Sequence, residues 1–114
     1  LVHRLKELAK DGRGFLFLSS FSALEGNHEE GLKYAQRSIE RSPSCATCYG
    51  TMSGHLLALG KTDDAMEALL RAMDLYREEG VIPMSMYRLR KAIKRQMRLE
   101  EANEPSAETA DQAR

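Results

Sequence analysis

The chain has 114 residues, 42% of them hydrophobic, which is enough for one domain with a modest apolar core. Its 17 basic and 17 acidic residues balance, but they are segregated: residues 1–80 carry 10 basic and 12 acidic groups, residues 81–99 carry 6 basic and none acidic, and residues 100–114 carry 1 basic and 5 acidic. The sequence has no run of 18 or more apolar residues, so we expect no membrane-spanning helix within it.

Apolar residues recur at helical spacing along the whole chain, which predicts an all-α fold. Residues 1–10 form an amphipathic helix, interpreted as a half repeat or an N-terminal cap, and residues 11–14 are a glycine-containing break. Helices are expected at 15–25 and 29–41, with Pro43 ending the second, and then at 49–59 and 63–79, with Gly80 ending the fourth. The sequence begins with Leu1, so we expect it to be part of a longer chain.

The last helix is expected from Met84 to Glu101 and is amphipathic. Its apolar stripe consists of Met86, Leu89, Ile93 and Met97, and we expect this stripe to cover the face that the preceding helices leave open. A basic surface lies broadly opposite, formed by Arg88, Lys91, Lys94, Arg95 and Arg98. Residues 103–114 contain no large apolar residue, so we expect a disordered acidic tail.

Residues 15–76 contain two copies of one pattern, offset by 34 residues. Residues 26–39 align with residues 60–73 without a gap, and Ser19 aligns with Ser53. Gly26 and Gly60 are expected to adopt left-handed backbone conformations between two helices. Acidic pairs follow in the first turn of the next helix, where the helix dipole favours them. Small residues at seven-residue spacing are expected to let neighbouring helices approach closely; they are Gly31, Ser38, Ala65 and Ala72.

This pattern resembles the tetratricopeptide repeat family, with departures at Ser22, Gly31 and Arg77. The resemblance implies pairs of antiparallel helices stacked as a right-handed α-solenoid. The expected organisation is an N-terminal helix (1–11), a first repeat (12–45), a second repeat (46–79), a basic capping helix (80–102) and the tail (103–114).

In this family the first helices of successive repeats line a concave groove. The matching positions here are Arg13, Leu16, Phe17, Ser20 and Ala23, followed by Thr47, Gly50, Thr51, Gly54 and Leu57. The resemblance implies that this apolar groove binds a peptide or helical segment of another protein. The family's Lys and Asn clamp for a C-terminal carboxylate is absent. Alternatively, Gly50 and Gly54 serve only the packing of the terminal helix.

Two sets of residues raise the question of chemistry. Cys45 and Cys48 form a Cys-x-x-Cys, a motif that in other settings binds zinc or cycles disulfides. No second Cys pair or His pair accompanies it and it follows no βαβ pattern, so we expect neither a metal site nor redox chemistry, but two inert, reduced thiols in a cytoplasmic setting. His3, His28 and His55 fall on three different predicted elements, and no nucleophile motif surrounds the serines. We therefore expect no catalytic residues and no cofactor.

The basic surface has several interpretations. It is a solvated face of a capping helix, or it binds an acidic protein partner or a second copy of the chain; nucleic acid or an anionic membrane surface ranks behind these. Taken together, the sequence predicts a non-catalytic protein interaction module, of the kind found in scaffolds, chaperones and regulators. The alternative is a regulatory or nucleic-acid-binding domain that acts through the basic helix.

Overall fold

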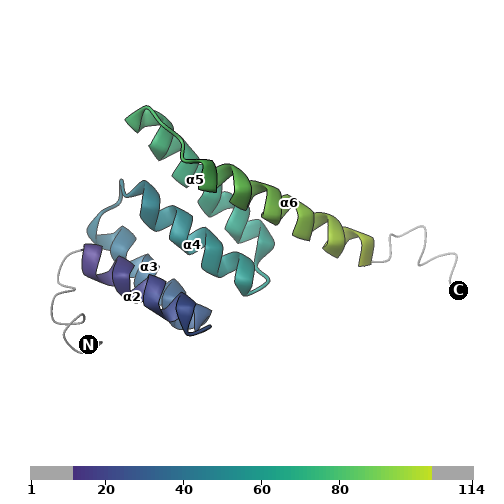
Figure 1. Cartoon of the computed structure of the whole chain (residues 1–114), viewed down its shortest axis with the longest axis horizontal. Helices are drawn as coiled ribbons and strands as arrows, with labels where there is room; N and C mark the ends of the chain where they lie inside the picture. The colour runs from purple at the N-terminus through teal and green to yellow at the C-terminus, as the bar shows by residue number, and fades with distance from the viewer. Residues whose placement is uncertain (1–11, 104–114) are drawn as a thin grey trace, which may run out of the picture.

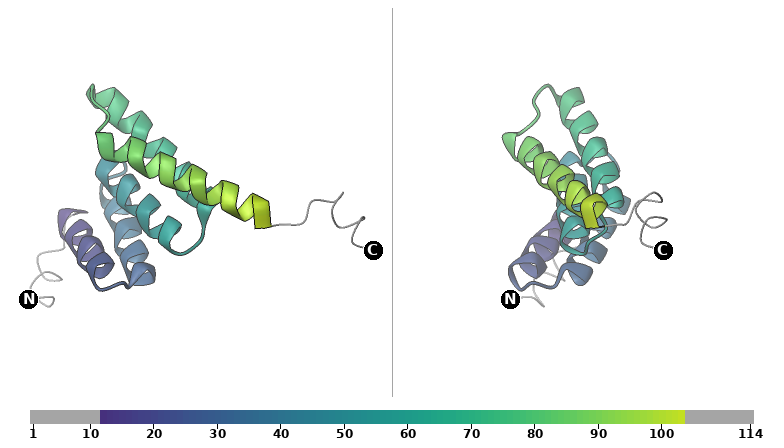
Figure 2. Two further views of the ribbon diagram at one scale, coloured as in Figure 1. Left: turned by 45° about the vertical axis from the view of Figure 1, so that its right-hand side comes forward. Right: turned by 90° about the vertical axis from the view of Figure 1, so that its right-hand side faces the viewer.

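The computed structural model describes residues 12–103, and every regular element in this range is a helix. The helices are α2 (Gly12–Leu24), α3 (His28–Arg41), α4 (Ala46–Ala58), α5 (Thr62–Glu79) and α6 (Met84–Asn103). Figures 1 and 2 show them arranged in chain order, from the α2–α3 pair at one end to α5 and α6 at the other. The all-α prediction is confirmed for this range. The predicted helix at 1–10 and residues 104–114 of the predicted tail lie outside the described residues. Asn103, predicted as the first residue of the disordered tail, is instead the last residue of α6.

Two glycines form the turns between paired helices. Gly26 and Gly60 have φ angles of +77° and +78°, a backbone region that residues with a Cβ rarely adopt. Each donates its N–H to the carbonyl three residues earlier, Ala23 or Leu57, at 3.0 Å. The predicted left-handed conformations are confirmed, and Gly80 ends α5 in the same region with a φ of +103°.

The start of α3 is capped by a reciprocal pair of hydrogen bonds. The Asn27 side chain accepts from the backbone N–H of Glu30 at 3.3 Å and donates its amide to the Glu30 carboxylate at 2.8 Å. The acidic pairs 29–30 and 63–64 lie in the first turns of α3 and α5, as predicted. Their charges therefore lie where the helix dipole is positive.

Two predicted helix starts are wrong by three residues. α2 begins at Gly12 rather than residue 15, because glycine lowers helix stability without preventing helical φ and ψ angles. α4 begins at Ala46 rather than residue 49, because the Cys45 sulfur accepts a hydrogen bond from the Cys48 N–H and caps the helix there.

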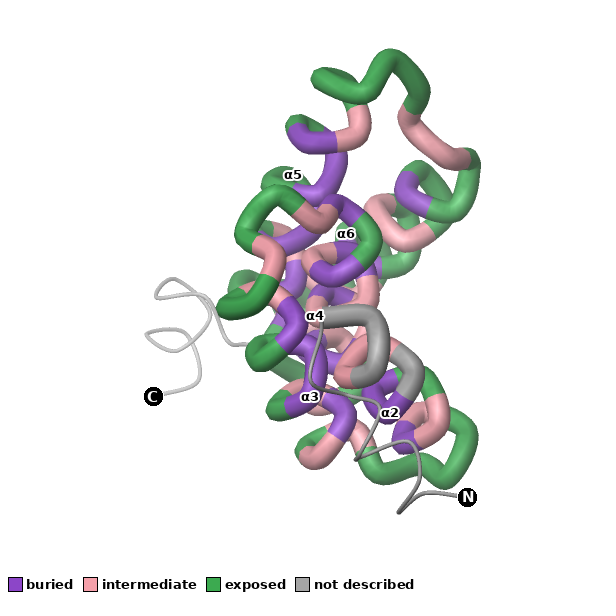
Figure 3. The backbone as a smooth tube through the Cα atoms, turned by 90° about the vertical axis from the view of Figure 1, so that its left-hand side faces the viewer, coloured by how far each residue is buried: buried purple, intermediate pink, exposed green. Residues whose placement is uncertain are grey.

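The described residues form two apolar clusters. Figure 3 shows the buried segments where the helices lie against one another. The smaller cluster joins Leu18 and Tyr34, with Phe15 packed against them. The predicted small residues of α3 and α5 are all buried, which confirms their role at helix contacts. The main core consists of Leu56, Ala65, Ala68, Leu69, Ala72, Met73, Met86 and Ile93.

A buried serine joins the two helices of each pair. The Ser19 hydroxyl of α2 donates to the Gly31 carbonyl of α3 at 2.7 Å, and the Ser53 hydroxyl of α4 donates to the Ala65 carbonyl of α5 at 2.6 Å. Both serines are fully buried. The same hydrogen bond therefore recurs with an offset of 34 residues in both donor and acceptor.

Helix α6 closes the main core, as the sequence predicts. Ile93 is fully buried and Met86 is 8% exposed, while Leu89 and Met97 are half-buried against the same cluster. The far end of α6 is held by a 2.6 Å hydrogen bond from the Thr62 hydroxyl to the Glu100 carboxylate. The apolar stripe thus packs on α4 and α5 along most of its length.

We predict that truncation after Gly80 abolishes cooperative folding. Burial of Met86 and Ile93 alone contributes roughly 3–6 kcal/mol before ordering costs, which is comparable to the stability of many small domains. Thermal melting with light scattering checks this on residues 1–80, with residues 1–103 as the matched control that keeps α6. A 1–80 product that stays monomeric and melts cooperatively near the parent temperature would show that α6 is not required.

Candidate functional site

The residues predicted to line a concave groove lie on α2 and α4, and part of that surface is already occupied. Gly50 is buried, and a Cβ placed on it would lie 3.0 Å from the terminal methyl of Met86. The glycine therefore serves the close packing of α6, which was the alternative interpretation of this position. Leu57 is half-buried against the main core.

The other predicted groove positions are less enclosed. Thr47 and Ser20 are exposed, and Thr47 shares a 2.9 Å hydrogen bond with the Tyr76 hydroxyl. Gly54 has open space around its missing Cβ. Leu16, Ala23 and Thr51 are half-buried, and the structure does not describe the side chains of Arg13 and Phe17. Whether these residues bind a partner stays a prediction.

A hollow of about 630 Å³ opens between α3 and α5, and α4 forms its floor. We call it the α3–α5 hollow. The side chains of Tyr49, Met52 and Leu56 contribute apolar surface, and Leu70, which is 49% exposed, stands at its side. The full lining is Leu32, Gln36, Tyr49, Met52, Leu56, Lys61, Asp64, Glu67, Ala68, Leu70, Arg71 and Asp74.

The rim of the α3–α5 hollow is charged. Lys61 and Arg71 supply two cations, and Asp64, Glu67 and Asp74 supply three anions, all of them exposed. The Arg71 guanidinium lies 5.9 Å from the centre of the Tyr49 ring, within cation–π range. None of the ten predicted groove residues lines this hollow, because its walls come from α3 and α5 and its floor is formed by other residues of α4, namely Tyr49, Met52 and Leu56.

A second hollow of about 680 Å³ lies along α2 and α3 and is more polar. Its aromatic walls are Phe15 and Tyr34, whose ring centres are 6.4 Å apart. The guanidinium of Arg37 lies 5.6 Å from the centre of the Phe15 ring. Because charged side chains cover the aromatic surface, this hollow offers less apolar area than the α3–α5 hollow.

Three residues that the sequence placed on separate elements meet in a buried hydrogen-bonded chain. Ser19 lies on α2, His28 is the first residue of α3, and His55 lies on α4. The Ser19 hydroxyl oxygen is 2.8 Å from His55 Nε2, and the two histidine Nδ1 atoms are 3.1 Å apart. Sequence reasoning missed this convergence, although Gly31 at a small-residue position is a signal for it.

The hydrogen bonds fix which nitrogens carry protons. Ser19 uses its only hydrogen on the Gly31 carbonyl, so its oxygen accepts from the Nε2–H of His55. His55 Nδ1 is then the acceptor for the Nδ1–H of His28. Ser19 is fully buried and donates away from His55, so this arrangement does not activate a nucleophile.

Burial governs the charge state of His55, which is 3% exposed. Burial lowers the pKa of His55 below its ordinary value of 6.5, and the neighbouring His28 lowers it further, while a hydrogen bond with the backbone of Ser19 acts in the opposite direction. The neutral form is therefore the one that fits the fold.

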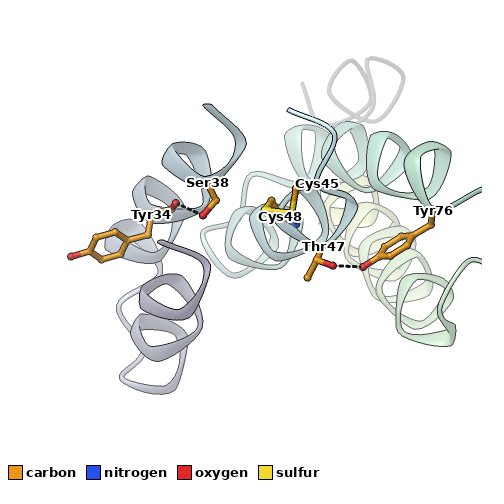
Figure 4. The surroundings of a disulfide bond; sticks show 6 residues. All are labelled: Tyr34, Ser38, Cys45, Thr47, Cys48 and Tyr76. Carbon is orange, nitrogen blue, oxygen red and sulfur yellow. Dashed lines mark hydrogen bonds between the residues drawn. A yellow bond between two sulfur atoms is a disulfide. The ribbon is translucent and has the colours of Figure 1, made fainter. Parts of the chain in front are cut away.

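Cys45 and Cys48 are joined by a disulfide at the start of α4 (Figure 4). The expectation of two reduced thiols is wrong. The first turn of α4 places the Cα atoms of the two cysteines 5.3 Å apart, inside the range that a disulfide requires. Cys45 is half-buried, whereas Cys48 is 1% exposed. Within residues 12–103, no three His, Cys, Asp or Glu side chains lie close enough to hold a metal ion.

The basic surface of α6 is exposed at all five predicted positions, Arg88, Lys91, Lys94, Arg95 and Arg98. Among the described residues none of these five forms an ion pair. Two apolar side chains, Met84 and Leu99, are also exposed on this helix. Among residues 12–103, none of the helices combines the length and the apolar content that a membrane-spanning segment needs.

No family model matches the sequence, and no curated protein shows significant similarity to it. The candidate sites are thus the α3–α5 hollow, the basic surface of α6, the Ser19–His55–His28 chain and the disulfide.

We predict opposite effects of alanine at two glycines. A Cβ at Gly31 would overlap the His55 ring, so Gly31→Ala should lower the free energy of unfolding by about 1–3 kcal/mol. At Gly54 a Cβ meets nothing within 4 Å, so Gly54→Ala should raise it by about 0.5–1 kcal/mol through helix propensity. Urea unfolding measures both, and equal shifts in the two variants would contradict the placement of His55.

We predict that acidification destabilises the fold through His55. The unfolded chain binds a proton near pH 6.5, whereas folded His55 binds it only at lower pH, so the free energy of unfolding falls as pH drops from 6.5 towards the folded pKa. The loss is at most about 1.4 kcal/mol per pH unit. Urea unfolding between pH 5 and 8 tests this on the parent, on His55→Gln and on His3→Gln as a matched control. If His55→Gln kept the parent slope below pH 6.5, the prediction would be wrong.

Proposed function

We propose that this chain is a non-catalytic interaction module that binds an extended or helical segment of a partner protein. We further propose that residues 12–79 form two tetratricopeptide-type repeats of antiparallel helices. The recurring serine hydrogen bonds and the paired glycine turns, each offset by 34 residues, support the repeat assignment. In such architectures each pair contacts only its neighbours and leaves extended surfaces for binding.

The observation that carries the binding proposal is the α3–α5 hollow. It combines an apolar floor, provided by Tyr49, Met52 and Leu56, with a rim of charged side chains. Binding sites for peptides are commonly built in this way, since apolar pockets provide affinity and a few polar groups fix orientation. Asp74 of the rim is paired with Arg77 at 2.9 Å, which leaves Asp64, Glu67, Lys61 and Arg71, so the favoured segment has an apolar anchor flanked by charged residues of both signs.

The concave groove predicted on α2 and α4 is a second candidate surface for the same function. Its open part is centred on Gly54, where a partner backbone can approach closely. Both surfaces use α4, but they share no residue, so substitutions distinguish them.

We predict that Leu70→Glu weakens partner binding by about tenfold or more, because it places a charge beside the apolar floor. Leu24→Glu is the matched control, since Leu24 is 87% exposed and does not line the hollow. Peptides are selected from a random displayed library against the full chain, and their affinities for the parent and both variants are measured by calorimetry.

Circular dichroism first establishes that both variants keep the parent melting temperature. Selected peptides that lose affinity for Leu70→Glu and not for Leu24→Glu support the α3–α5 hollow. Equal affinities for both variants, with loss instead in Gly54→Gln, would transfer the function to the concave groove. A library that gives no specific peptide would contradict the proposed function.

The basic surface of α6 favours a second candidate, a regulatory domain that binds nucleic acid. The supporting observation is the set of five exposed cations without ion pairs among the described residues. For a short labelled DNA duplex, the logarithm of the binding constant would then fall linearly with the logarithm of the salt concentration. The slope is set by the number of phosphates contacted. Peptide binding in an apolar hollow lacks this steep dependence, so a salt titration separates the two functions.

A further inference from the structure

The Cys45–Cys48 disulfide has no role in the proposed binding function, since neither residue lines the α3–α5 hollow. Its two sulfurs differ in their surroundings. Cys45 precedes the first residue of α4 and is half-buried, whereas Cys48 lies one turn into the helix and is 1% exposed. Cys45 is therefore the residue of the pair that offers surface to a dissolved thiol.

The start of α4 stabilises negative charge on that sulfur. Cys45 is the N-cap residue, and its sulfur accepts a 3.2 Å hydrogen bond from the backbone N–H of Cys48. The positive end of the dipole of a 13-residue helix points at the same place, and the first turn of α4 contains no acidic residue that would oppose it. A helix N-terminus is a recognised environment for reactive thiolates.

The surroundings of Cys48 keep it enclosed. Figure 4 shows the disulfide at the start of α4, with Ser38 of α3 on one side and the hydrogen-bonded pair Thr47 and Tyr76 on the other. Ser38 is fully buried. Cys48 can thus react with Cys45, its neighbour within the helix turn, more readily than with any dissolved molecule.

We propose that Cys45 and Cys48 form a thiol–disulfide exchange site, in which Cys45 is the sulfur that reacts with outside thiols and Cys48 is the resolving sulfur. The reaction partners are low-molecular-weight thiols and disulfides of the glutathione class. This proposal does not depend on the proposed binding function.

The exchange balances in two steps. A thiolate attacks the Cys45 sulfur, a mixed disulfide forms there, the Cys45–Cys48 bond breaks, and Cys48 leaves as a thiolate that takes a proton from water. A second thiolate then attacks the outer sulfur of the mixed disulfide and releases Cys45 as a thiolate. Two low-molecular-weight thiols are oxidised to one disulfide, and the protein disulfide is reduced by two electrons. Oxidation of the protein dithiol by oxidised glutathione is the reverse reaction.

The first test uses the two single variants, Cys48→Ser and Cys45→Ser, with oxidised glutathione as the probe. Mass spectrometry follows the formation of the mixed disulfide under native conditions. Cys48→Ser, which keeps the accessible sulfur, should react about tenfold or more faster than Cys45→Ser. It should also react faster folded than in denaturant, because the helix start promotes the thiolate. Equal rates for the two variants, or a faster reaction in denaturant, would overturn the proposal.

The second test uses the unsubstituted chain and so does not depend on how the variants fold. The protein is equilibrated with mixtures of reduced and oxidised glutathione, and free thiols are counted by alkylation. Reversible two-electron interconversion, with the helical circular dichroism signal retained throughout, is the expected result. A disulfide that reduced glutathione opens only when the chain is unfolded would be purely structural and would overturn the proposal.

Discussion

The packing of α4 on the α2–α3 pair depends on one buried imidazole. The His55 ring fills the space that a Cβ at Gly31 would need, and both of its nitrogens have hydrogen-bond partners, Ser19 and His28. A polar ring is stable at such a position only because no donor or acceptor is left without a partner. An apolar side chain of similar size would leave the His28 N–H without its acceptor, and a smaller one would leave a cavity over Gly31.

The contact of α6 with α4 uses the same geometry with different chemistry. There Met86 of the later helix lies over Gly50 of the earlier one, as His55 lies over Gly31. Methionine is flexible and does not titrate, so this contact tolerates small shifts and is insensitive to pH. The imidazole is rigid and titratable, which makes the contact between α4 and the α2–α3 pair the one that responds to acid. The two ends of the described chain therefore differ in what can perturb them.

The features that the sequence predicted correctly are set by neighbouring residues. Gly26 and Gly60 impose the turns, and helical spacing alone identifies the stripe of α6. The contact of His28 with His55 joins two helices across 27 residues of sequence, so no local pattern encodes it. Only Gly31 pointed to it, since glycine inside a helix costs up to about 1 kcal/mol relative to alanine and so indicates an occupied Cβ position. For the Cys pair the spacing was visible, but spacing does not determine oxidation state. The α3–α5 hollow arises from the separation of α3 and α5, two helices that are not consecutive in the chain, which no local pattern encodes.

Helix α4 links all of these sites, because each of its faces contacts a different one. Its start carries the disulfide, its buried polar face places His55 against α2 and α3, and Gly50 receives α6. Its remaining apolar side chains form the floor of the α3–α5 hollow. A packed helix moves as a rigid element, so a shift of α4 caused at one of these contacts changes the shape of the floor. The helix that forms the floor of the α3–α5 hollow is therefore also the one whose packing against α2 and α3 depends on the neutral imidazole of His55.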